Sequence, residues 1–349
     1  MGDIFNHLLK LHARLCREAP PAVGALVKWM IRFQFGDGQD FFLIDPVDYA
    51  PALGAKGLAK YQDELEQIAA TIPAEPGEAQ KRAAWKLRME HPGAGELPSQ
   101  HAHARFVLQY NAERLSVAHR DAAGIIETHA GDQSRAYKLH NTAKALFEIG
   151  ATELAIDWAK RAAFLEDGHQ AEQAGKYWCE LLHEHRAGEE LAARHTQFSR
   201  WPSSANAARL HLAAGEASPS LQAEVLEKLA ERPNDYIEFL LQTLQDVPLA
   251  WAEAHRLDLD SAAQWEDLVE AYQLYDPLAV LPVLERIIEA SLTVADARNY
   301  RMVVRQLRKH HAIATAANRA ADTAVLLSSI RARNRNRPRL LRELAVLKY

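Results

Sequence analysis

Alanine and leucine dominate this chain, and their abundance limits what it can fold into. The 349 residues include 62 Ala and 44 Leu against 16 Gly and 15 Pro. Ala and Leu are strong helix formers, whereas Gly and Pro interrupt helices. This composition argues against a β-rich fold and predicts an all-α protein. Hydrophobic residues make up 48% of the chain and charged residues 25%, as in folded rather than disordered proteins.

Helix start and stop residues recur along the sequence. Asp276-Pro277 and Ser218-Pro219 each place a capping side chain before a proline, and Ser261 with Gln264 forms a capping box. Asp45 precedes Pro46 and is expected to be a turn or cap residue. Four glycines are expected to end helices in left-handed conformations: Gly150, Gly168, Gly188 and Gly215.

Few segments interrupt this succession of helices. Phe41 to Ile44 is the best strand candidate, but it is more simply an apolar segment that docks onto neighbouring helices. Residues 73–78 and 91–99 are expected to be loops because Pro and Gly cluster there.

One segment predicts how the helices pair. Between 136 and 168, small or apolar residues fall at Leu139, Ala143, Leu146, Gly150, Ala155, Ala159 and Ala162. This is the tetratricopeptide pattern, in which small side chains let two helices approach closely across a turn glycine. Other segments keep the helix-pair rhythm without the consensus. The sequence therefore predicts a degenerate tetratricopeptide-like helical-pair array, an α-solenoid.

Several longer segments, in this order, resemble a known family. They are residues 29–35, Asp48-Tyr49, residues 53–61, 198–203, 251–255, 299–301, 306–308 and 330–344. In their order and spacing they resemble the helical region that follows the zinc finger in bacterial SWIM zinc-finger proteins, and related stand-alone helical proteins. The resemblance covers nearly the whole chain in outline.

The chain departs from that family at the zinc finger itself. A SWIM finger has a Cys-x-Cys pair followed by Cys-x-His, which this sequence does not contain. Zinc-dependent nucleic-acid contacts therefore do not carry over, and the resemblance implies only a tetratricopeptide-like interaction region without catalytic residues. The expected organisation is an N-terminal helical region over 1–130 and a tetratricopeptide-like array with a basic C-terminal cap over 131–349.

Candidate chemical sites in the sequence are weak. Cys179 and His183 share one helical face, but no third zinc ligand is identifiable, and a core Cys with a partly exposed His is the simpler interpretation. The pair His101-x-His103 has the same weakness, and His310-His311 on a basic helix is expected to be solvated. No nucleophile elbow, phosphate loop or dinucleotide-binding glycine pattern is present. We expect no enzyme activity, no metal and no cofactor.

Seven tryptophans are spread singly along the chain, at 29, 85, 158, 178, 201, 251 and 265. Each is expected to fill the gap between adjacent helices. The alternative is a tryptophan that anchors a partner in a groove. Trp201, before Pro202 at an expected helix junction, is the main candidate for that role.

The charge is unevenly distributed. The formal net charge is −5, but residues 298–349 contain 13 Lys and Arg against two acidic residues, a net +11, and the other 297 residues carry −16. Arg331, Arg333, Arg335, Arg337 and Arg339 alternate with small or polar residues. Such a basic layer could dock on the acidic body and cap the array, bind phosphates, or bind an acidic protein. The absence of aromatics between 331 and 342 argues against base stacking.

Composition and pattern together predict an interaction protein. We expect a non-catalytic scaffold whose helical-repeat groove binds a segment of an unknown protein partner. The alternative is a nucleic-acid-associated accessory protein that uses the basic C-terminal layer. Two scattered cysteines, no visible signal peptide and no membrane-length apolar run predict a cytoplasmic protein without membrane association.

Overall fold

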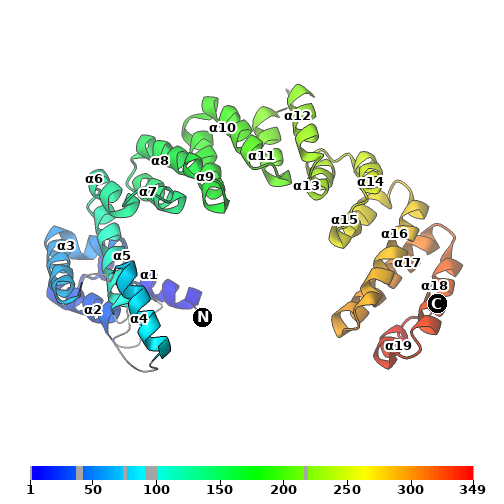
Figure 1. The fold of residues 1–349 in the computed structure, drawn as a ribbon, viewed down its shortest axis with the longest axis horizontal. Coiled ribbons are helices and arrows are strands. Elements are labelled where there is room, and N and C mark those ends of the chain that lie inside the picture. Colours follow the sequence, from blue (N-terminus) through cyan, green and yellow to red (C-terminus); the bar gives the residue numbers. More distant parts are fainter. Residues whose placement is uncertain (1, 37–41, 74–76, 91–100, 216–218, 349) are drawn as a thin grey trace. The chain divides into compact units, whose positions relative to one another are not determined.

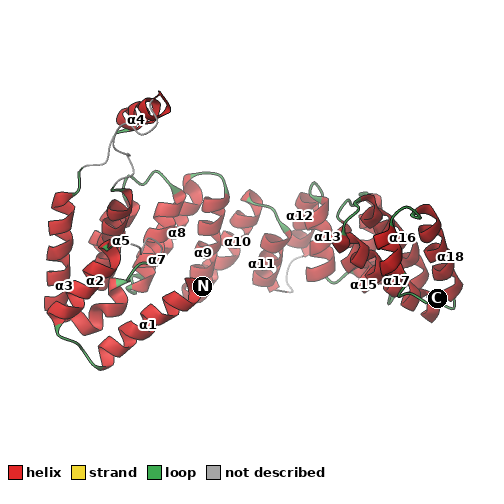
Figure 2. Cartoon of the chain, turned by 90° about the horizontal axis from the view of Figure 1, so that it is seen from below, coloured by secondary structure: helices red, strands yellow, loops and turns green. Residues whose placement is uncertain are grey.

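The described residues of the computed structural model are all-helical, as the composition predicts. The structure describes residues 2–36, 42–73, 77–90, 101–215 and 219–348, and these form nineteen α-helices, two short π-helices and no strand (Figures 1 and 2). The chain divides into two compact units, Met1–Gly188 and Glu189–Tyr349. Helices Ala102–Ala118, Ile126–Ala130 and Ala136–Glu148 pack together across residue 130, the expected boundary between regions 1–130 and 131–349.

The first unit contains nine α-helices and one π-helix within its described residues. They are α1 (Gly2–Glu18), α2 (Val23–Phe35), α3 (Pro46–Thr71), α4 (Glu78–Glu90), α5 (Ala102–Ala118), α6 (Ala122–Ile125), η1 (Ile126–Ala130), α7 (Ala136–Glu148), α8 (Thr152–Leu165) and α9 (His169–His185). Helices α1, α2, α3 and α5 share one apolar core, which includes Met30, Tyr49 and Leu115.

The second unit holds the other ten α-helices. They are α10 (Ala187–Arg200), α11 (Ser204–Ala214), α12 (Pro219–Leu229), α13 (Pro233–Glu238), α14 (Val247–Arg256), α15 (Ala262–Tyr272), α16 (Pro277–Thr293), α17 (Ala297–Ala316), α18 (Ala320–Arg333) and α19 (Pro338–Leu344), with the π-helix η3 (Phe239–Thr243) between α13 and α14. Ile288, Leu292, Val303, Leu340 and Leu344 belong to one core cluster that joins α16 and α17 to α19.

Capping residues act largely as the sequence predicts. The Asp276 carboxylate accepts from the backbone N–H groups of Leu278 and Ala279, and Ser261 accepts from the Gln264 N–H. The Gln264 amide, however, donates to the Asn234 carbonyl rather than closing a capping box. Pro219 begins α12, whereas Ser218 lies outside the described residues.

The four glycines expected at helix C-termini behave differently from one another. Gly150 and Gly215 follow α7 and α11 with φ of 82° and 63°, which confirms two of them. Gly168 is instead the residue that precedes α9, and Gly188 lies in the first turn of α10. The Gly188 prediction was wrong because Arg186 alone separates α9 from α10, which starts at Ala187. Gly168 has a positive φ of 133°, but it acts as the N-cap of α9 rather than as the residue that ends α8.

The irregular segments confirm one prediction and leave another open. Phe42 to Ile44 is non-helical and not a strand, and the Ile44 side chain is fully buried, so this part of the segment docks on the helices as expected. Phe41 and residues 91–99 lie outside the described residues, as do residues 74–76 of the other expected loop.

Helix α8 packs against both α7 and α9, which also contact each other. The small residues predicted to allow this are buried: Ala143, Ala155, Ala159 and Ala162 all have no exposed surface. Their short side chains let the helix axes approach closely. In the described part of the chain, no helix is both long enough and apolar enough to cross a membrane.

Candidate interaction surfaces

A groove runs along α5 in the first unit. Its volume is about 1170 Å³ and it is open to solvent on one side. One wall is the face of α3 that carries Gln62, Leu65 and Ala69, and the other is the face of α5 that carries Phe106, Gln109, Ala112 and Ser116. Both sets recur every three or four residues, so each lies on one side of its helix.

The groove has an apolar floor and a polar rim. Leu65 and Leu115 are each 6% exposed at its base, whereas the Phe106 ring, at 57% exposed, stands at the mouth. A smaller cavity of about 500 Å³ adjoins the groove on the α7 side, lined among others by His129, Tyr137 and Asn141. Gln109 and Thr128 line both cavities, and the Gln109 amide donates to the Thr128 carbonyl at 3.0 Å between them.

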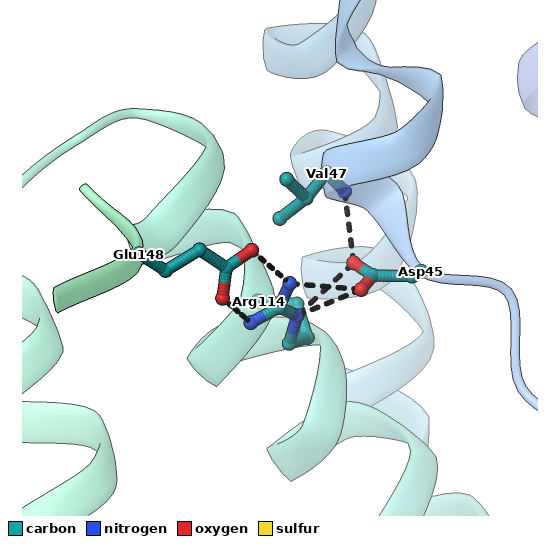
Figure 3. Close-up of polar contacts among 4 residues, drawn as sticks. All are labelled: Asp45, Val47, Arg114 and Glu148. Atoms are coloured by element: carbon teal, nitrogen blue, oxygen red, sulfur yellow. Dashed lines mark hydrogen bonds and ion pairs between the residues drawn. The ribbon is translucent and has the colours of Figure 1, made fainter. Parts of the chain in front are cut away.

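An ion-pair network joins the two helices of the groove walls to α7. Arg114 of α5 lies between Asp45, which precedes α3, and Glu148 at the end of α7 (Figure 3). Its guanidinium donates from Nε to the Asp45 carboxylate at 3.0 Å and makes two bonds to Glu148, at 2.8 and 2.7 Å. Asp45 also accepts from the Val47 N–H at 2.9 Å, which confirms its predicted role as the N-cap of α3.

The same network shifts the protonation equilibria around it. Burial alone would lower the pKa of Arg114, but its hydrogen bonds to Glu148 and Asp45 outweigh burial and raise that pKa. Burial, together with the nearby Asp45 charge, raises the pKa values of Asp48 and Tyr110. Burial lowers the pKa of His129, which lines the smaller cavity.

A buried triad of polar side chains joins α2, α3 and α5. The Tyr61 hydroxyl donates to Asn111 Oδ1 at 2.8 Å and accepts from the Gln34 amide, and Asn111 Nδ2 donates to Gln34 Oε1 at 3.2 Å. All three side chains are at most 1% exposed. A closed hydrogen-bonded set of this kind satisfies every partner and allows one relative placement of the three helices.

The structure separates the five arginines predicted as a site. Arg331 donates to the carbonyls of Leu344 and Leu347, and Arg337 donates to the Leu292 carbonyl at 2.6 Å. Arg333 forms an ion pair with Glu289 of α16. These three side chains therefore hold the C-terminal helices together.

The other two predicted arginines face solvent. Arg335 and Arg339 are exposed, and neither side chain makes a hydrogen bond or ion pair with the described residues. The same holds for Arg298, Arg301, Arg308 and Arg342. The basic C-terminal layer thus has both an internal docking role and an open surface.

Trp201 lies between α10 and α11, at the predicted junction, but it is half-buried rather than open. The Arg200 guanidinium covers its ring at 4.6 Å, and the Trp201 carbonyl accepts from the Asn206 amide at 2.7 Å. These contacts give it a local structural role. Of the seven tryptophans, Trp85 departs from the core-filling prediction, since it is 67% exposed on α4.

The histidine and cysteine candidates do not assemble. No three metal-ligating side chains come together among the residues the structure describes. Cys179 is fully buried while His183 is exposed. His310 corrects a prediction: it is fully buried, not solvated, because α16 and α18 pack against its face of α17, and its Nδ1 lies 2.9 Å from Thr323 Oγ1.

Sequence reasoning missed the groove and the Arg114 network. Asp45 carried a recognisable capping pattern, but Arg114 and Glu148 lie 69 and 34 residues from their partners and no local pattern marks them. No protein-family model matches the chain, and no curated protein matches it. The resemblance to the SWIM-associated helical region remains a prediction.

Proposed function

We propose that this chain is a non-catalytic interaction scaffold with a tetratricopeptide-like helical array, and that it binds a segment of another protein in the α3–α5 groove. The groove is the observation that carries this proposal. Ligand pockets for small molecules occupy roughly 300–1,000 Å³ and enclose their ligand. A larger groove that stays open along one side suits a chain segment instead.

The dimensions of the groove agree with a peptide ligand. From Ala102 to Ser116 the α5 wall extends about 21 Å at 1.5 Å per residue, enough for about six extended residues. Phe106 offers an exposed aromatic anchor, and Gln62 and Gln109 lie on the same groove walls with their amide N–H groups donating to Glu66, Glu113 and Thr128. An apolar floor with a polar rim is the usual anatomy of a protein–protein interface.

Helix pairing supports the repeat architecture in this proposal. Helices α7 and α9 both pack on α8 and on each other, which is the arrangement that neighbouring tetratricopeptide units would have. All residues that line the groove lie between Gln62 and Thr128, so the proposed binding site belongs to the expected N-terminal helical region rather than to the predicted array. Neither Cys16 nor Cys179 forms a disulfide bond, which is consistent with the cytoplasmic location we propose.

The test is affinity purification of the full chain from its source cells, with and without a blocked groove. Ala112 is exposed in the middle of the groove wall, so Ala112→Trp fills the groove without disturbing the core. We expect one abundant partner to co-purify with the wild type and to be lost with Ala112→Trp. Phe164 on α8 is exposed to a similar extent as Phe106 but lies outside the groove, so Phe164→Ala should retain the partner. A partner that binds Ala112→Trp as well as the wild type would disprove the groove assignment.

The alternative function, an accessory role on nucleic acid, would use α17–α19 in the second unit. A test of the groove therefore neither supports nor contradicts this alternative.

A further inference from the structure

Helix α17 presents a row of arginines on one side. Arg298, Arg301, Arg305 and Arg308 are spaced by three or four residues, so they occupy an arc of about 80° and a length of about 15 Å. The opposite side, with Val303, Leu307 and His310, is buried in the core. The arginine row is therefore the solvent-exposed side of this helix.

Helix α19 extends the basic surface. It packs against α17 through Leu340 and Leu344, which leaves Arg339 and Arg342 exposed on its outer side. Arg335, in the turn before α19, is exposed as well. Glu343 is the only carboxylate within α17 and α19 themselves.

Four nearby acidic side chains already have basic partners. Arg305 and Lys309 bind Glu266 and Glu270 of α15, and Arg333 binds Glu289 of α16. Arg319 binds Asp322 at 2.8 Å. These four acids are thus paired with Arg305, Lys309, Arg333 and Arg319, and Arg305 belongs to the row itself. Six exposed arginines have no such partner among the described residues and can bind an external anion: Arg298, Arg301, Arg308, Arg335, Arg339 and Arg342.

We infer that the exposed surface of α17 and α19 binds the phosphate backbone of double-stranded nucleic acid, without reading its sequence. All six open cations on these elements are arginines, whose forked guanidinium matches phosphate oxygens. A row of about 15 Å spans roughly half a turn of a B-form duplex. This inference does not depend on the groove of the first unit.

The surface chemistry distinguishes a duplex from other polyanions. Single-stranded nucleic acid is bound by stacking on aromatic rings, but the only Phe, Tyr or Trp in 297–348 is Tyr300, which is 5% exposed. Protein interfaces and membrane-surface helices need apolar anchors, yet the described parts of α17 and α19 expose no large apolar side chain. Val325 and Val346, the large apolar side chains exposed among residues 297–348, lie outside both helices.

The experiment measures anisotropy of a labelled 20-base-pair DNA or RNA duplex of random sequence with the full-length protein, over a series of salt concentrations. Six phosphate contacts predict that affinity falls by about 1,000-fold between 50 and 200 mM salt. The test variant combines Arg301→Ala, Arg308→Ala and Arg339→Ala. This variant should bind the duplex about tenfold more weakly or worse. The slope of log affinity against log salt concentration should decrease in magnitude by about 3.

A matched control removes three exposed cations of the first unit with Arg14→Ala, Arg17→Ala and Lys56→Ala. This control should retain wild-type affinity and slope, and circular dichroism should show the same helix content for all three proteins. The inference is overturned if the duplex does not bind at 50 mM salt, or if the test variant binds like the wild type. It is also overturned if the control loses as much affinity, or if a single strand or phosphatidylserine vesicles bind more tightly than the duplex at equal salt.

Discussion

Arg114→Met should loosen the packing of α5 against α3 and α7. Methionine keeps the aliphatic volume of the arginine stem but removes the cation between Asp45 and Glu148. The Arg114 side chain is 17% exposed and that of Asp45 27%, so this pair is shielded from solvent more than a surface ion pair. Glu148, at 41% exposed, contributes less.

The expected loss of stability follows from these exposures. Hydrogen bonds to charged groups contribute roughly 1.5–3 kcal/mol net when buried, and solvent-exposed ion pairs about 0.2–1 kcal/mol. Removing the Arg114 cation, and leaving the Asp45 and Glu148 carboxylates without it, should cost about 2–3 kcal/mol. Asp45→Asn keeps the oxygen that caps α3 and loses only the charge, so it should cost about 1 kcal/mol, with a coupling to Arg114→Met of about 1–2 kcal/mol.

Hydrogen exchange of the full-length protein, followed by mass spectrometry, measures this effect helix by helix. A loss of 2–3 kcal/mol should speed exchange in α3, α5 and α7 by roughly 30- to 140-fold, because each 1.4 kcal/mol is a factor of ten. Helices α14 to α18 serve as the internal control and should not change. Unchanged protection in α3, α5 and α7, or an equal change in both units, would refute this assignment.

Three further substitutions test the interior of the first unit. Burial, together with the nearby Lys144 charge, lowers the pKa of His140 to about 4. As the pH falls, His140 is therefore protonated in the unfolded chain before it is protonated in the folded chain. Stability should then fall as pH drops from 6.5 to 4, by about 2–3 kcal/mol, and His140→Phe should flatten that slope in urea titrations. Gly54 has φ 60° and ψ −179° at the kink of α3, a conformation open mainly to glycine, so Gly54→Ala should cost about 1–3 kcal/mol in the same assay. Tyr61→Phe strips Gln34 and Asn111 of a buried partner and should cost about 2 kcal/mol; a loss under 0.5 kcal/mol would show that the triad is not rigid.

Local chemistry made the helical fold predictable. Cap residues such as Asp276 and Ser261 act on N–H groups within three positions, so their effect is readable from neighbouring residues. The buried face of α8 was likewise readable, since Ala155 and Ala162 recur at helical spacing and are both fully buried.

Contacts between distant residues were not predictable. Whether an arginine of the C-terminal layer is free depends on acceptors far away in sequence: Arg337 binds a carbonyl 45 residues earlier, and Arg333 a carboxylate 44 residues earlier. Arg335 and Arg339 have the same local pattern and find no partner among the described residues. His310 shows the same limit, because its basic neighbours suggested exposure while helix packing buries it.

The most direct test of the proposed function is site-specific cross-linking in the source cells. A photoreactive phenylalanine analogue replaces Phe106 at the mouth of the groove, and in a separate protein it replaces Phe164 on α8. We predict one discrete cross-linked partner from position 106, none from position 164, and loss of the product when Ala112→Trp fills the groove. No product at position 106, or the same product from position 164, would contradict the proposal that this groove binds a protein segment.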